Sequence, residues 1–109
     1  MRDPTVRQLS ASDLKTLIER KVPLRLVDVR TEGERAIAKI DGSRLLDKAY
    51  HDELLTLDRD TTLVFQCHHG MRSQAAAEYF LKQGFRNVHN LAGGIEAWSQ
   101  FVDPSVPRY

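Results

Sequence analysis

The residue with the greatest capacity for chemistry in this sequence is its single cysteine, Cys67, in the segment F-Q-C-H-H-G-M-R-S-Q-A. A lone cysteine makes no internal disulfide and belongs to no multi-cysteine metal site, and its ordinary role is that of a small buried hydrophobe. The neighbours of Cys67 favour another role. Gly70 permits a curled backbone whose N–H groups point inward at an anion, and the helix expected from Arg72 adds its positive N-terminal end.

These features all favour the thiolate, which is the nucleophilic form of cysteine. A free cysteine titrates near 8.5, so about 3% is ionised at pH 7, and a fall of about two pKa units ionises about three quarters of it. That fall corresponds to about 2.7 kcal/mol, whereas one helix terminus supplies about 0.3–1 kcal/mol. Several inward N–H groups are therefore required as well. We also expect Ser73 to cap the helix or donate its hydroxyl to the sulfur, and Arg72 to reach back over the rim of the loop.

The spacing between the cysteine and the arginine indicates which anion the loop holds. Tyrosine-phosphatase-type loops read C-x5-R, whereas Cys67 and Arg72 form a C-x4-R segment. A loop that is one residue shorter leaves less room for a tetrahedral phosphate above the sulfur. It still fits a sulfur atom attached to the cysteine. A phosphatase or arsenate reductase of related fold is therefore the weaker alternative.

Short strands and helices alternate along the chain, which favours an α/β fold with a parallel sheet covered by helices on both faces. Because sites in such sheets form at the carboxyl ends of strands, Cys67 is well placed after a buried strand and before a helix. The hydrophobic pattern predicts strands at 24–29, 43–46, 61–66 and 87–91, a helix from Ser10 that ends before Pro23, a helical turn at 31–38, and helices at 50–57, 72–83 and 95–101.

The length and the composition limit the number of domains, the classes of partner and the expected location of the protein. A chain of 109 residues suits a single domain over 1–109, with a core at about 9–101 and terminal arms at 1–8 and 102–109. The net charge of +1 gives no indication of a nucleic-acid or membrane surface. The first twenty residues are charged and contain no signal-peptide pattern, and no apolar run is long enough to span a bilayer, so we expect a cytoplasmic protein.

Three motifs together resemble the rhodanese-like domain family of single-domain sulfurtransferases. The first is L-V-D-V-R at 26–30, followed by Glu34 and then by I-A-K-I-D-G-S at 37–43; the second is C-H-H-G-M-R-S at 67–73, and the third is L-A-G-G-I-E-A-W at 91–98. The resemblance covers residues 9–101 and implies a five-stranded, mostly parallel sheet. It departs from the common G-H-I-P-G-A segment, where this chain has Ala38 to Ser43.

The resemblance also implies a function. Cys67 takes the outer sulfur of a donor such as thiosulfate, becomes a persulfide and passes the sulfur to a thiol acceptor, with no metal or organic cofactor. The substrate-binding residues that it implies surround the transferred sulfur and are His68, His69, Gly70, Met71, Arg72 and Ser73. An alternative of another class is a binding or persulfide-relay module that needs a partner protein.

Several other residues receive simpler interpretations. Asp28 and Arg30 are expected to form an ion pair that braces neighbouring loops, and Trp98 is expected in the core. His51 and His89 are expected at the surface. The adjacent pair His68 and His69 lacks the i, i+2 or i, i+4 spacing of metal ligands, so no metal site is predicted.

His68 also stands where the family often has Arg or Lys. Because histidine is only fractionally charged near neutrality, we expect donor turnover to fall as the pH rises from about 6 to 8.

Overall fold

The computed structural model describes residues 4–109 of the chain. Within them strands and helices alternate in the order β1 (Arg7–Leu9), α1 (Ala11–Glu19), β2 (Arg25–Asp28), α2 (Glu32–Ile37), β3 (Ser43–Leu45), α3 (Lys48–Leu54), β4 (Leu63–Gln66), α4 (Met71–Lys82), β5 (Val88–Leu91) and α5 (Gly94–Phe101). The strands form one five-stranded sheet in the order β1-β5-β4-β2-β3, and each neighbouring pair is parallel. The predicted fold class is confirmed.

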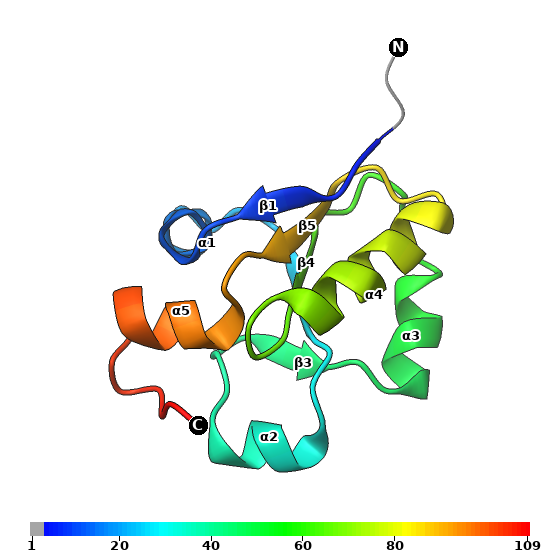
Figure 1. Ribbon diagram of the computed structural model, residues 1–109. Helices are drawn as coiled ribbons and strands as arrows, with labels where there is room; N and C mark the ends of the chain where they lie inside the picture. The colour runs from blue at the N-terminus through cyan, green and yellow to red at the C-terminus, as the bar shows by residue number, and fades with distance from the viewer. Residues whose placement is uncertain (1–3) are drawn as a thin grey trace.

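Helices cover both faces of the sheet (Figure 1). Helices α1 and α5 lie together on one side, α3 and α4 lie on the other, and α2 lies apart from both pairs, next to the C-terminus. Each pair of helices encloses its own apolar cluster, because successive residues of a strand point to opposite faces. On β4, Val64 belongs to the cluster under α1 and α5, while Leu63 and Phe65 belong to the cluster under α3 and α4. Trp98 is buried in the first cluster, as predicted.

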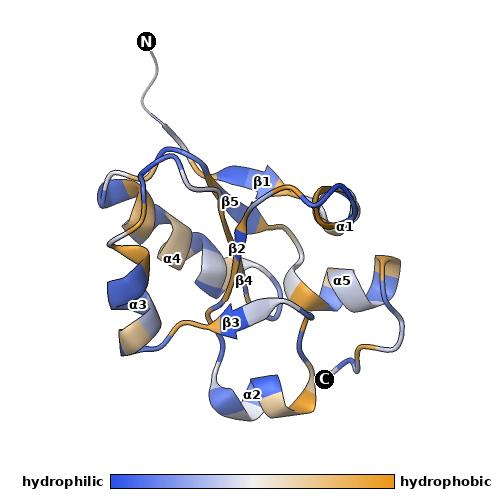
Figure 2. Ribbon diagram, turned by 180° about the vertical axis from the view of Figure 1, so that it is seen from behind, coloured by the Kyte–Doolittle hydropathy of each residue, from blue (hydrophilic) through white to orange (hydrophobic). Residues whose placement is uncertain are grey.

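The helices alternate between hydrophobic and hydrophilic residues along their length, as Figure 2 shows for α3, α4 and α5. This amphipathic pattern fits helices that pack on a sheet with one side and face water with the other. Within residues 4–109, no helix is long and apolar enough to cross a bilayer.

Most predicted elements are found within two residues of their expected positions, and the exceptions have local causes. Helix α3 begins at Lys48 because the side chain of Asp47 accepts a hydrogen bond from the Tyr50 N–H at 2.8 Å and caps the helix. The turn expected at 31–38 is a true helix, α2, which a reciprocal capping box between Thr31 and Glu34 opens.

The two segments expected as terminal arms differ from that expectation over their described residues, whereas residues 1–3 of the first arm lie outside the described part of the chain. Residues 7–9 form the edge strand β1, which pairs with β5. Only one of its residues, Leu9, is buried, so the strand has too short an apolar pattern to be recognised from sequence. The C-terminal segment is also anchored, since Val106 is buried and its carbonyl accepts a 2.5 Å hydrogen bond from the Ser99 hydroxyl.

Two glycines let α5 begin directly against the loop that follows β4. Gly93 and Gly94 both have positive φ angles, of +78° and +60°. The N–H groups of Ile95 and Glu96 then donate to the carbonyls of Cys67 and His68 at 2.8 and 3.1 Å. A Cβ atom on Gly94 would lie 2.4 Å from both carbonyl oxygens, so no larger residue fits there.

We expect Gly94→Ala to lower the free energy of unfolding by about 3 kcal/mol, because it adds a steric clash to an unfavourable positive φ. Urea denaturation followed by circular dichroism measures the change. Gly42→Ala is the matched control, since Gly42 also has a positive φ, of +85°, but no atom within 4 Å of its Cβ position. Its cost should be about 1 kcal/mol, and equal costs for the two variants would contradict the proposed close approach.

Candidate active site

Cys67 lies at the carboxyl end of the central strand β4, and the following loop enters α4. The turn depends on Gly70, whose φ of +103° is in the region that favours glycine. A Cβ atom there would lie 3.3 Å from the N atom of Gly93 and from the Leu91 carbonyl oxygen. The predicted position of the cysteine and the predicted need for a glycine agree with these contacts.

Polar hydrogen-bond donors surround the sulfur of Cys67, although the residue is only 1% exposed. Its Sγ accepts hydrogen bonds from the Gly70 N–H at 3.1 Å, from the Ser73 N–H at 3.4 Å and from the Ser73 hydroxyl at 3.3 Å. Burial raises the pKa of the thiol, but the hydroxyl and N–H of Ser73 and the N–H groups of Gly70 and His69 outweigh it, so the pKa is lowered. The site therefore favours a buried thiolate.

The donors around the sulfur, from His69, Gly70 and Ser73, are called the ring of donors. The N-terminal end of α5 orients part of this ring. The carbonyls of Cys67 and His68 point at α5, because they accept its first N–H groups. In a trans peptide the N–H points away from the carbonyl of the same unit, so the N–H groups of His68 and His69 face away from α5. The N–H of His69 is one of the groups that lower the pKa of Cys67.

The hydroxyl of Ser73 is shared between two acceptors. Its Oγ lies 2.5 Å from Oδ1 of Asn90 and 3.3 Å from the Cys67 sulfur. Asn90 is held in this orientation because its Nδ2 donates to the Gly70 carbonyl at 3.0 Å. Since one hydroxyl carries one proton, the thiolate and Asn90 compete for it. The backbone N–H groups of Gly70 and Ser73 donate to the sulfur without competition from Asn90.

The side chain of Arg72, which was expected to reach back over the rim of the loop, is held by Glu34. Its guanidinium makes a bidentate ion pair with Glu34, with N–O distances of 2.7 and 2.8 Å. The Tyr109 hydroxyl donates to the same carboxylate at 2.7 Å and accepts from Arg30 at 3.0 Å. The hydrogen bond from Arg72 is the main cause that holds the pKa of Glu34 well below its usual range. The charge of Cys67 also contributes to raising the pKa of Arg72.

The predicted ion pair between Asp28 and Arg30 is confirmed, and both side chains are fully buried. Two hydrogen bonds of 2.9 and 2.8 Å join them, and Arg30 also donates to the Ala38 carbonyl at 2.7 Å. Through Tyr109 and Glu34, this buried pair is connected to Arg72. The pair is structural, and it anchors the charged groups that hold the side of the loop next to α2.

The two histidines of the loop lie at its rim. The ring of His68 stacks between the rings of His69 and Tyr109, with centroid distances of 3.9 Å to each. Burial and the neighbouring His69 lower the pKa of His68. A lowered pKa keeps the ring neutral to lower pH, so any loss of activity from its deprotonation belongs at lower pH than an ordinary histidine would give.

The remaining expected positions are as follows. Met71 is 84% exposed and therefore belongs to the rim rather than to the ring of donors. His51 and His89 are only partly exposed, and His51 contacts both Asp52 and Tyr79.

Sequence reasoning did not identify four residues outside the loop that contact the loop residues: Glu34, Asn90, Glu96 and Tyr109. Glu34 belongs to the first family motif and Glu96 to the third, so the motifs were a usable signal for these two.

The sequence profile of the family described as "Rhodanese-like domain" matches residues 10–101. The chain belongs to the rhodanese-like domain family. The match covers all elements from α1 to α5, together with the complete cysteine loop. The resemblance seen in the three motifs is therefore confirmed, and the protein is a rhodanese-type enzyme.

Related proteins carry sulfurtransferase names. The chain is 43% identical over 74 residues to the thiosulfate sulfurtransferase GlpE of Pseudomonas aeruginosa, a match that covers 67% of each protein. It is 34% identical over 106 residues to the putative sulfurtransferase YtwF of Bacillus subtilis, covering 91% of this chain and 96% of that protein. At the level of the family, the activity is sulfur transfer.

Solved structures support the fold. A rhodanese-like domain protein from Staphylococcus aureus aligns with a TM-score of 0.76 at 26% identity, over 95% of this chain and 99% of the other. The human single-domain sulfurtransferase TSTD1 aligns with a TM-score of 0.72 at 24% identity, over 90% and 96% of the two chains.

We expect Ser73→Ala to raise the pKa of Cys67 while leaving most of the ring of donors in place. Because the thiolate is the reactive form, its rate of alkylation by iodoacetamide rises with pH through this pKa, and the rise should move to higher pH. At neutral pH the rate should fall about two- to tenfold. Ser99→Ala removes another buried hydroxyl and is the control; an equal effect of both substitutions would contradict a direct action on the sulfur.

Proposed function

We propose that this protein is a sulfurtransferase that moves a sulfane sulfur through a persulfide on Cys67. The observation that carries the proposal is the set of N–H and hydroxyl groups that converge on the Cys67 sulfur. These donors lower the pKa of the thiol although the residue is almost fully buried, which favours the nucleophilic thiolate. Family membership and the sulfurtransferase relatives support the same chemistry.

The first half of the reaction loads the enzyme. The Cys67 thiolate attacks the outer sulfur of thiosulfate, a new S–S bond forms, and the S–S bond of thiosulfate breaks. The electron pair of that bond leaves with sulfite, so no proton and no external oxidant is needed. The product is the Cys67 persulfide anion, whose charge the loop N–H groups stabilise.

The second half transfers the sulfur to an acceptor. The thiolate of a small molecule or of a protein attacks the outer sulfur of the persulfide. The acceptor becomes a persulfide and Cys67 leaves as a thiolate, which restores the starting state. Because the ring of donors favours the thiolate, it also makes Cys67 a good leaving group.

Arg72 is proposed to guide the anionic donor toward the sulfur. Its side chain is 47% exposed at the rim, and Glu34 holds it in place through two hydrogen bonds. A dianion such as thiosulfate carries more charge than the Glu34 carboxylate and can attract the exposed side of the guanidinium. His69 and Met71 are exposed on the same loop and complete the rim that the donor meets.

Mass spectrometry after thiosulfate treatment tests the central step. We expect a mass gain of about one sulfur atom on the peptide that contains Cys67. Cyanide or a dithiol should remove it, and Cys67→Ser should abolish it. Absence of the adduct from the correctly folded wild-type chain would contradict the proposal, and activity on an aryl phosphate instead would favour the phosphatase alternative. Sulfur uptake only from a partner protein would favour a relay.

Substitution of Arg72 tests the proposed recognition of the donor. Arg72→Ala should raise the KM for thiosulfate about tenfold, since one charge-assisted contact is lost. The rate at which a preformed persulfide reacts with the acceptor should change little. Arg86→Ala is the matched control, because Arg86 is an exposed arginine that pairs with Asp60 at 2.7 Å, away from the loop. Equal kinetics for the two variants would show that Arg72 serves only as a surface ion pair.

A further inference from the structure

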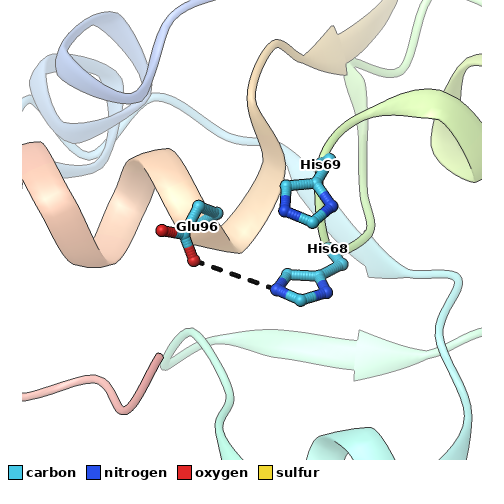
Figure 3. Close-up of side chains that lie close together, drawn as sticks. All are labelled: His68, His69 and Glu96. Carbon is cyan, nitrogen blue, oxygen red and sulfur yellow. Dashed lines mark ion pairs between the residues drawn. The ribbon is translucent and has the colours of Figure 1, made fainter. Parts of the chain in front are cut away.

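The rim of the cysteine loop carries a second group of side chains with a different chemistry. His68, His69 and Glu96 each offer one nitrogen or oxygen ligand atom, and these atoms all lie within 4.8 Å of one another (Figure 3). The two histidines come from the loop after β4 and the glutamate comes from the first turn of α5. We propose that these three residues form a binding site for a zinc-type divalent metal ion.

The donor set suits such an ion. Zinc binds neutral imidazole nitrogens and carboxylate oxygens, usually with four ligands, so three side chains leave one position for water. Nε2 of His68 has no hydrogen-bond partner among residues 4–109 and is shielded from solvent. It lies 3.8 Å from the Glu96 carboxylate, too far for a hydrogen bond but on the side from which an ion would bind.

The backbone already brings the ligands together. The Glu96 N–H donates to the His68 carbonyl at 3.1 Å, so the two residues are held at a fixed separation. Ligand atoms of a tetrahedral zinc ion lie about 3.4 Å apart, because each is about 2.1 Å from the metal. The ligand atoms, which now lie within 4.8 Å of one another, must therefore approach by up to about 1.4 Å. His69 is exposed and its ring can turn to provide this approach.

A cationic side chain already stands beside this carboxylate. Arg108 pairs with Oε1 of Glu96, and its Nε donates to that oxygen at 2.6 Å. Oε2 is the oxygen that faces His68. The side chains of His69, Glu96, Arg108 and Tyr109 line an open pocket of about 450 Å³, which has room for an ion and its water. Metal binding and the Arg108 contact therefore compete for one carboxylate.

Calorimetric titration of zinc chloride into the full chain tests the site. Because zinc also binds thiolates, the titration uses the Cys67→Ser background, which makes the result independent of the proposed sulfur transfer. We expect one zinc ion per chain. Added Glu96→Gln or His69→Asn should weaken binding by at least about tenfold, as expected for the loss of a ligand. Arg108→Ala should strengthen it, because it frees the carboxylate.

His51→Asn is the matched control, since His51 also has a carboxylate neighbour, Asp52, at 2.9 Å but no second histidine beside it. It should leave the affinity unchanged. Melting curves without metal check that each variant is folded. Two results would overturn the site: no zinc binding to the Cys67→Ser chain, or an affinity that is unchanged after Glu96→Gln and His69→Asn.

Discussion

The central physical constraint in this structure is the lowered pKa of a cysteine thiol that is almost fully buried. An unpaired charge at such a depth is costly, and the pKa of the group shifts to remove it unless hydrogen bonds compensate. Gly70 and Ser73 supply that compensation from the first residues of α4 and the turn before it. The parallel sheet matters because it places Cys67 at the carboxyl end of a central strand, directly before the helix whose N-terminal amides the sulfur needs.

Two supports from distant parts of the chain hold the loop. On one side α5 binds the carbonyls of Cys67 and His68, which turns the intervening N–H groups away from α5. On the other side the buried pair Asp28–Arg30 is linked through Tyr109 to Glu34 and then to Arg72. Neither support touches the sulfur. Both reduce the freedom of the loop, so the donors are in place before the substrate arrives.

Sequence reasoning predicted most of the fold and the centre of the site for physical reasons. The apolar run Leu63 to Phe65 is typical of a strand covered on both faces, and the combination of a cysteine, Gly70 and a following helix predicted the turn from β4 into α4. It failed for β1, which is short and mostly exposed. It also failed to place the Arg72 side chain, because its partner Glu34 is separated by 38 residues, and long-range pairs of exposed charges leave no periodic pattern.

The close approach at Gly94 has a consequence for how this reactivity can be moved between proteins. The segment that carries the cysteine is contiguous, which suggests a unit that could be transplanted to another sheet. Yet the direction of its first peptide groups is imposed by α5, which begins 27 residues after Cys67. Gly94, the first residue of that helix, leaves no room for a side chain. A graft of the loop alone would keep the donors of Gly70 and Ser73 but lose the fixed direction of the His68 and His69 N–H groups, whereas a graft that includes the paired glycines and their helix would transfer both.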